Sequence, residues 1–286
     1  MEKSRALVLS GGGSKGSWQA GVVKTLADVY PEGFDVISGT SVGAINAAGL
    51  AMFPKKDFRD AAKWLESRWK NDLSIWKYKF PRYLAGLWSN SLGSNKALKR
   101  FLGKHMLPDR IRSSGVKLIL TAVDIETGFV SRFTENSDDL IGAVLASSSF
   151  PVMFPMQQIG STMYTDGGVR DIAPLSPAIR AGVSEVVVVT TTDPYRPDVA
   201  TVPKNALKML ARVIDLMATE IILNDVNECK RINKSLENHP TKRAIDIRLI
   251  YPSKTLGDSL DFGKDLMRSQ FRLGMEDAAG YFVGDL

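Results

Sequence analysis

The feature that most constrains the fold is a serine between two glycines, Gly39-Thr40-Ser41-Val42-Gly43. An apolar run typical of a strand, Phe34–Ser38, precedes it, and a run typical of a helix, Ala44–Met52, follows it. A strand, a sharp turn and a helix are the context in which G-x-S-x-G forms a nucleophile elbow. The glycines permit the tight reversal, and the helix begins beneath the serine. Ser41 is therefore a candidate nucleophile.

A second strand, loop and helix open the chain. The run Ala6–Ser10 resembles a parallel strand buried on both faces, and Ser17–Val29 has helical spacing. With the elbow, this alternation predicts an α/β fold of three α/β/α layers around a mostly parallel sheet. The other expected helices are Asp57–Trp69, Lys204–Leu236 and Gly263–Phe282, and the other expected strands are Val116–Val123, Phe129–Phe133, Ser184–Thr191 and Ala244–Tyr251.

The longest expected helix, Lys204–Leu236, has one apolar face at spacings of three and four residues. We expect this face to pack into the core rather than to bind a cofactor. Its residues are Leu207, Leu210, Ala211, Ile214, Met217, Ala218, Ile221 and Ile222. In contrast, Asn71–Ser94 is rich in aromatic residues and is expected to be irregular.

Composition indicates one globular domain over residues 1–286. Of the residues, 44% are hydrophobic and 24% are charged, and no linker divides the chain. The apolar stretches are shorter than the roughly 18 residues that span a bilayer, and the first residues do not resemble a signal peptide. A cytoplasmic location is the default expectation. A single cysteine, Cys229, excludes an internal disulfide and a multi-cysteine metal site.

Positive charge is concentrated between residues 63 and 117, which carry an excess of ten positive charges and four of the five tryptophans. Such a segment suits an anionic membrane surface, as a lid or an interfacial region with peripheral contact. It is equally consistent with a solvated basic face whose tryptophans pack inward. No signature of nucleic-acid binding is present, so we expect no nucleic-acid partner.

The first expected loop is rich in glycine, and Gly11, Gly13 and Gly16 satisfy G-x-G-x-x-G. A dinucleotide site would also need an acidic residue at the carboxyl end of the second strand, and a P-loop would need its lysine after the last glycine. Neither condition is met. The unhindered amides of Gly11, Gly12 and Gly13 instead suit an oxyanion hole, and a tight packing turn is the alternative.

A serine nucleophile needs a base. The chain has two histidines, His105 and His239, and both resemble surface residues. A third candidate is Asp166, in Asp166-Gly167-Gly168, although such a triplet usually marks a turn. Asp124 and Glu126 are expected to be turn residues. The residues alone leave these candidates open, because members of a triad are neighbours only in space.

Four motifs together resemble the patatin-like phospholipase family over about residues 5 to 190. They are Gly11-Gly12-Gly13-Ser14-Lys15-Gly16, Gly39-Thr40-Ser41-Val42-Gly43, Ala146-Ser147-Ser148-Ser149-Phe150-Pro151 and Asp166-Gly167-Gly168. The resemblance implies a Ser-Asp dyad with Ser41 as nucleophile and Asp166 as base. The amides of Gly11, Gly12 and Gly13 would hold the oxyanion. Burial would have to raise the pKa of Asp166 for it to act as a base.

The chain departs from the family pattern at two places. Ser10 stands where many members have aspartate, and Arg170-Asp171 follows the Asp-Gly-Gly motif where an uncharged pair is common. Arg170 and Asp171 would either alter headgroup preference or pair with each other.

The function that the resemblance implies is hydrolysis of carboxylic esters of lipids through an acyl-enzyme, without a metal or organic cofactor. The partner would be a lipid or ester substrate, and the sequence does not indicate an oligomeric state. Two alternatives stay open. One is a membrane-surface binding or regulatory protein of the same fold, and the other is a short-chain esterase or thioesterase.

Overall fold

The computed structural model describes residues 4–72, 91, 93–195, 202, 206–236, 239 and 244–283, without the side chains of 206–208 and 211. Most of the segment that we expected to be irregular, Asn71–Ser94, lies outside the described residues, as do Trp76 and Trp88. The irregular conformation of that segment therefore stays a prediction.

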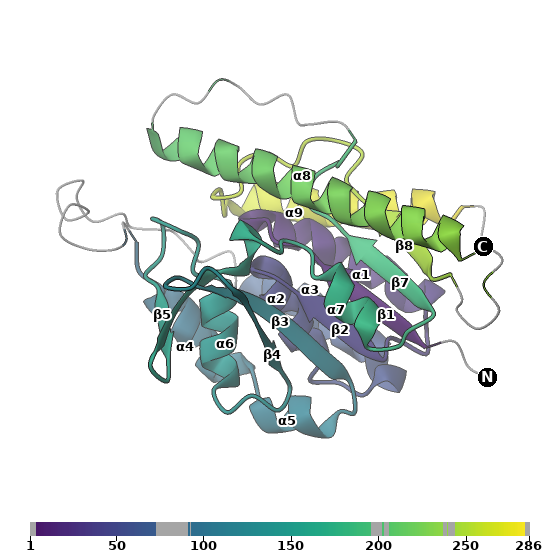
Figure 1. Ribbon diagram of the computed structural model, residues 1–286, viewed down its shortest axis with the longest axis horizontal. Coiled ribbons are helices and arrows are strands. Elements are labelled where there is room, and N and C mark those ends of the chain that lie inside the picture. The colour runs from purple at the N-terminus through teal and green to yellow at the C-terminus, as the bar shows by residue number, and fades with distance from the viewer. Residues whose placement is uncertain are drawn as a thin grey trace.

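A central sheet of eight strands organises the described part of the molecule (Figure 1). Its strands are β1 (Arg5–Leu9), β2 (Val36–Gly39), β3 (Lys117–Asp124), β4 (Val130–Thr134), β5 (Gln157–Ile159), β6 (Thr162–Asp166), β7 (Glu185–Val189) and β8 (Asp246–Ile250). Their order is β5-β6-β3-β2-β1-β7-β8, and β4 also pairs with β3. The five strands from β3 to β8 in this order are mutually parallel, which confirms the predicted α/β class.

Helices cover both faces of the sheet. The α-helices are α1 (Gly16–Val29), α2 (Val42–Leu50), α3 (Phe58–Asn71), α4 (Lys96–His105), α5 (Pro108–Ser113), α6 (Leu140–Ser147), α7 (Leu175–Arg180), α8 (Ala206–Ser235) and α9 (Lys264–Tyr281). Short 3-10 turns are η1 (Gly13–Lys15), η2 (Lys55–Asp57) and η5 (Gly167–Val169).

Alternate residues of β1 divide the core into two layers. Leu7 and Leu9 pack with residues of α1, α2, α3 and α9, whereas Ala6 and Val8 pack with residues of α7 and α8. This alternation follows from the two-residue period of a strand. A strand that is apolar throughout is consequently buried between two helical layers, as the sequence predicted.

The register of β3 brings a distant part of the chain to the end of β2. Gly39, the last residue of β2, pairs with Leu120, and Asp166, the last residue of β6, pairs with Ala122. One edge of β3 is occupied by β4 along both of these positions. Because a strand has only two edges, β2 and β6 share the other edge, one beyond the other. Asp166 therefore lies just past the end of β2, where the elbow begins.

The long helices and the strands of the parallel part of the sheet were predicted well, but several short elements were missed. The predicted helix Lys204–Leu236 corresponds to α8, and Ser17–Val29 corresponds to α1. No element was predicted between Phe133 and Ser184, where the structure has α6, β5, β6 and α7. These elements have three to eight residues each, which is too few for a period to be visible.

Candidate active site

Ser41 occupies the tip of a strained turn between β2 and α2. Its φ is 57°, a value in the left-handed region that residues other than glycine rarely adopt. The flanking glycines are sterically required. A Cβ on Gly39 would lie 2.2 Å from the Gly43 oxygen, and a Cβ on Gly43 would lie 2.1 Å from the Leu9 oxygen. The structure thus has the geometry expected of a nucleophile elbow.

The carboxyl end of α6 holds the backbone of the elbow. The Ser41 amide donates to Ser147 Oγ at 3.0 Å, and Ser148 Oγ donates to the Ser41 carbonyl at 3.1 Å. The carbonyl of Ser149 accepts from the amide of Asp166 at 3.0 Å. Three consecutive serines therefore bind the backbones of both Ser41 and Asp166. The sequence analysis noted this triplet only as a motif and did not predict its role.

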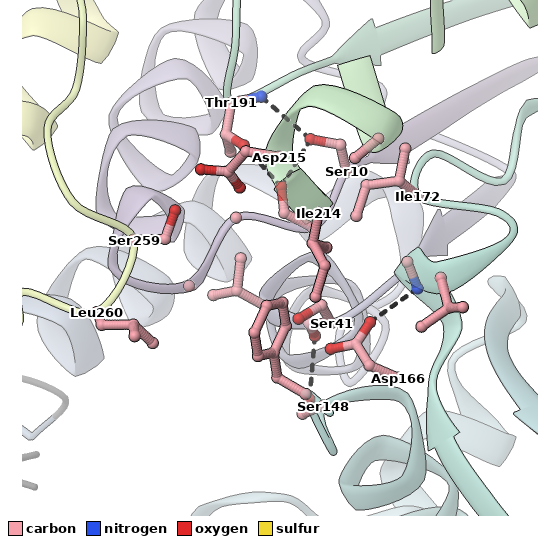
Figure 2. A pocket seen from close by; sticks show the side chains of 18 of the residues that line it. Ser10, Ser41, Ser148, Asp166, Ile172, Thr191, Ile214, Asp215, Ser259 and Leu260 are labelled. Atoms are coloured by element: carbon pink, nitrogen blue, oxygen red, sulfur yellow. Dashed lines mark hydrogen bonds between the residues drawn. The ribbon is translucent and has the colours of Figure 1, made fainter. Parts of the chain in front are cut away.

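Asp166 is buried beside Ser41 (Figure 2). Its Oδ1 accepts from the Gly168 amide at 2.8 Å, and its Oδ2 has no hydrogen-bond partner among the described residues. Burial raises the pKa of Asp166 to about 7, against the opposing effects of the Ser41 hydroxyl and the Gly168 amide. A carboxylate with such a pKa is half ionised near neutral pH, which suits a general base.

The glycine loop lies on the other side of Ser41. A Cβ on Gly11 would come within 3.1 Å of the Ser41 Cβ, so the loop and Ser41 are in close contact. The Gly11 amide donates to the Ile172 carbonyl at 2.9 Å and is occupied. The amides of Gly12 and Gly13 donate to no described residue. Of the three amides expected to hold an oxyanion, two are therefore available in this conformation.

Side chains that follow β1 and β7, those of Ser10 and Thr191, hold the glycine loop in its conformation. Ser10 Oγ accepts from the Thr191 amide at 3.0 Å, and Thr191 Oγ1 donates to the Gly11 carbonyl at 2.6 Å. A Cβ on Gly12 would lie 2.2 Å from Thr191 Oγ1, and one on Gly13 would lie 2.1 Å from the Ser259 oxygen. Ser10 thus serves as an anchor of the loop.

A buried polar network supports the loop from below. Trp69 Nε1 donates to Asn46 Oδ1 at 2.9 Å, and Asn46 Nδ2 donates to Gln19 Oε1 at 3.0 Å. Gln19 Nε2 in turn donates to the Ser10 carbonyl at 2.8 Å. These residues come from α3, α2 and α1. The sequence analysis missed Asn46 and Gln19, because polar residues within helices carry no signal of burial.

Ser41, Asp166 and the three loop glycines all line one cavity (Figure 2). Most of its other walls are apolar: Val42, Ile45, Leu98, Phe150, Pro151, Phe154, Val169, Ile172, Ile214, Ala218, Ile222, Leu260 and Phe262. Ile214, Ala218 and Ile222 belong to α8. The expectation that the apolar face of this helix serves only core packing was therefore wrong in part, because the face also forms a cavity wall.

The model of the patatin-like phospholipase family matches residues 7–179. The chain belongs to this family. The match confirms the resemblance inferred from the four motifs.

Curated relatives of this patatin-like protein share part of its chain. It is 28% identical over 182 residues to a cGAMP-activated phospholipase of Pseudomonas aeruginosa, covering 59% of this chain and 53% of that protein. It is 28% identical over 200 residues to the lysophospholipase NTE1 of Debaryomyces hansenii, covering 65% of this chain and 12% of that protein. The chain therefore spans about half the length of the first relative and far less of the second.

Among solved structures, VipD from Legionella pneumophila aligns with 99% of this chain and 67% of its own, with 15% identity and a TM-score of 0.47.

In the described part of the patatin-like protein, no three His, Cys, Asp or Glu side chains gather as a metal site would require. None of its described helices has the length and apolarity needed to cross a membrane.

Neither histidine lines the cavity of the patatin-like protein. His105, at the end of α4, is half-buried against α3, with Nδ1 3.1 Å from Arg68 NH1 and Nε2 4.0 Å from Asp72 Oδ1. His239 is exposed. Asp124 accepts hydrogen bonds from the backbones of Glu126 and Thr127, as expected of a turn residue.

Arg170 and Asp171 have different partners, so the expected alternative of an ion pair between them was wrong. Arg170 NH1 donates to the Gly128 carbonyl at 2.6 Å, and Asp171 Oδ2 lies 3.7 Å from Arg132 NH2. Burial raises the pKa of Asp171 to about 6, and Arg132 partly opposes this rise. The Asp171 side chain does not line the cavity.

The two described tryptophans of the basic segment pack inward. Trp69 is buried and hydrogen-bonded to Asn46, and Trp64 packs partly buried against the core. For these two residues the structure agrees with the packing interpretation rather than with an exposed membrane contact. Cys229 is a half-buried free thiol, with a pKa raised by burial.

Proposed function

We propose that this protein is a serine hydrolase that cleaves carboxylic esters of lipids, as a phospholipase A or related lipid acyl hydrolase. In the first step, Ser41 Oγ attacks the ester carbonyl while Asp166 accepts the hydroxyl proton. The C–O bond to the alcohol part breaks, and Asp166 returns the proton to the leaving oxygen. Water then attacks the acyl-serine ester with Asp166 again as base, which releases the fatty acid and restores Ser41.

The observation that carries this proposal is the state of the Asp166 carboxyl group. It is 2% exposed, one of its oxygens has no hydrogen-bond partner among the described residues, and it lies in the same cavity as Ser41. A buried carboxyl oxygen without a partner costs free energy. The cost is explained if this oxygen, Asp166 Oδ2, receives the proton of the Ser41 hydroxyl during catalysis. Strained and unsatisfied groups concentrate at functional sites.

The glycine loop supports the same chemistry. The tetrahedral intermediate carries a negative charge on the former carbonyl oxygen, which must be stabilised next to Ser41. The amides of Gly12 and Gly13 are free of other described partners and lie in the loop that contacts Ser41. We assign the oxyanion hole to these two amides. The Gly11 carbonyl and amide, both bonded elsewhere, hold the loop in place.

The apolar walls favour a substrate with a hydrocarbon chain. Phe150, Phe154 and Ile214 are among the many hydrophobic residues around Ser41. Apolar surface of this kind binds acyl chains by excluding water. The names of the two relatives, a phospholipase and a lysophospholipase, point to the same substrate class. A preference for short-chain esters or thioesters is the competing assignment.

Two substitutions test the mechanism. Ser41→Ala should abolish hydrolysis of a soluble p-nitrophenyl ester and labelling by a fluorophosphonate probe. Asp166→Asn should lower kcat by about a hundredfold to ten-thousandfold, the usual contribution of a general base. Asp124→Asn, at the end of β3 and outside the cavity lining, is the matched control and should behave as wild type.

Histidine variants test the alternative base. A double variant, His105→Gln with His239→Gln, should retain wild-type kcat because neither side chain lines the cavity. Full activity of Asp166→Asn, or inactivity of the histidine variant when it is folded by circular dichroism, would contradict the proposed dyad. Turnover of esters of increasing chain length, followed by phospholipids in vesicles, distinguishes the lipid assignment from the short-chain one.

A further inference from the structure

The N-terminal half of α8 is apolar on two sides. Its inner side contributes Ile214 and Ala218 to the cavity, and Ile222 continues this side just beyond the middle of the helix. Its outer side exposes large hydrophobic side chains to solvent, and these are Met209, Val213, Leu216 and Met217. A helix on the surface of a soluble protein normally presents polar residues outward. The outer side of this half of α8 therefore lacks a partner among the described residues.

The exposed residues form a stripe beside the cavity-lining side of α8, and we call this stripe the α8 rim. Met209, Val213 and Met217 are spaced by four residues, so they lie on one side of the helix over about 12 Å. The cavity-lining residues Ile214 and Ala218 are their immediate neighbours in sequence. Figure 1 shows this half of α8 at the end of the molecule where β5 lies. The stripe thus lies on the helix that forms one wall of the cavity containing Ser41.

An ion pair anchors α8 to the catalytic loop. Lys15, which follows the loop glycines, is 2% exposed, and its Nζ lies 3.9 Å from Asp215 Oδ2 on α8. Asp215 also lines the cavity (Figure 2). A buried lysine requires such a counter-charge. The rim formed by α8 is thereby held next to the oxyanion site.

Apolar residues from other elements near the cavity are exposed as well. Val169, in η5, lines the cavity and is partly exposed, and η5 contacts α8. Val152, next to the lining residue Pro151, is exposed and has a φ of 67°. A left-handed conformation is strained for a β-branched residue, and such strain concentrates at functional sites. Exposed hydrophobic residues in or next to the cavity wall therefore come from more than one element.

We propose that the outer stripe of α8, with Val169 and Val152, is the surface by which this protein docks onto a lipid bilayer. This inference rests on the proposed lipid hydrolysis. An acyl chain leaving a bilayer must cross the gap between the membrane and Ser41, and an apolar rim in contact with the membrane removes water from that gap. A second protein copy on the rim would instead cover the cavity entrance.

This assignment differs from the one suggested by charge alone. The basic segment between residues 63 and 117 was the sequence candidate for membrane contact, but its described tryptophans, Trp64 and Trp69, pack inward. The rim of α8 is apolar rather than basic. Docking through it should therefore persist at high salt, because hydrophobic burial is not screened by ions.

The first test uses vesicles of phosphatidylcholine and phosphatidylglycerol and the inactive Ser41→Ala protein. In that background, a double change, Val213→Glu with Met217→Glu, should weaken vesicle co-sedimentation at least tenfold. Ile232→Glu is the matched control, because Ile232 lies on the same helix, is exposed to 44% and does not line the cavity. The control should bind vesicles as the parent protein does, at low and at high salt.

The second test separates docking from chemistry. With Ser41 intact, the same double variant should lose vesicle phospholipid hydrolysis at least tenfold while keeping wild-type fluorophosphonate labelling and soluble-ester turnover. Failure of wild type to turn over either substrate would refute the proposed function, yet vesicle binding by Ser41→Ala would still be measurable. Met217→Trp provides a variant without added charge, and its fluorescence should shift to the blue on vesicles.

Four results would overturn the inference. The double variant could bind vesicles as tightly as its parent, the Ile232→Glu control could lose as much binding, or the fluorescence of Met217→Trp could stay unchanged on vesicles. Binding that disappears at high salt would likewise refute an apolar docking surface and would return the assignment to the basic segment.

Discussion

Replacing the proposed base, Asp166, should make this protein more stable above neutral pH even as it abolishes the proposed activity. The pKa of Asp166 is raised by burial to about 7 from a usual 3.8. The folded state therefore binds a proton between these two pH values that the unfolded state releases. This proton linkage contributes its full stabilisation below the unfolded-state pKa of 3.8, and the stabilisation is lost as the pH rises to about 7. Asparagine does not titrate, so the variant lacks this pH dependence.

The magnitude follows from the width of this pH window. Each pH unit between the two pKa values of Asp166 changes the free energy of unfolding by about 1.4 kcal/mol. Between about pH 5 and about pH 8, the part of the range below the folded-state pKa of about 7 spans about two units. The stability of Asp166→Asn relative to wild type should thus increase by about 3 kcal/mol over this range. The asparagine Oδ1 can still accept from the Gly168 amide, which limits other losses.

Urea unfolding of the two proteins at both pH values measures this difference directly. Groups that titrate in both proteins, such as Asp171 with its pKa raised to about 6, cancel in the comparison. An advantage of the variant that does not grow with pH would show that Asp166 is ionised in the folded protein well below pH 7. In that event, the reasoning that burial prepares this carboxylate as a base would fail.

Two further changes test the scaffold around Ser41. Trp69→Phe removes the donor to Asn46 Oδ1 and should lower the free energy of unfolding by about 1–3 kcal/mol, whereas Trp64→Phe, which loses no hydrogen bond identified among the described residues, should cost less. Gly43→Ala puts a Cβ 2.1 Å from a backbone oxygen and should destabilise by at least about 2 kcal/mol, whereas Gly103→Ala, with open space around it, should not destabilise. Urea unfolding measures both pairs, and equal effects within a pair would contradict the structural explanation.

Features that depend on neighbouring residues were predictable from sequence. The elbow at Ser41 follows from an apolar strand, two glycines and an apolar helix within about twenty residues. The glycine loop follows from the same kind of local pattern. Such short-range signals specify conformation because steric limits on φ and ψ act between adjacent residues. The order of four motifs then identified the family, which the family model confirmed.

The occupancy of the loop amides was not predictable. Gly11, Gly12 and Gly13 are consecutive residues of the same type, yet among the described residues only the Gly11 amide donates to a carbonyl, that of Ile172. This partner lies more than 150 residues away along the chain. Likewise, α8 has a clear apolar period, but the period does not tell a core face from a cavity wall or an exposed rim.

The sequence by itself determined which side chains are candidates for catalysis, Ser41 and its glycine-flanked turn above all. The tertiary structure decided which residues these side chains contact and how deeply they are buried. Ser41 and Asp166 are 125 residues apart, and they become neighbours because β6 occupies the edge of β3 just beyond β2. The same packing buries Asp166 and raises its pKa to about 7. Burial depends on the whole surrounding structure, and no local pattern in the sequence encodes it.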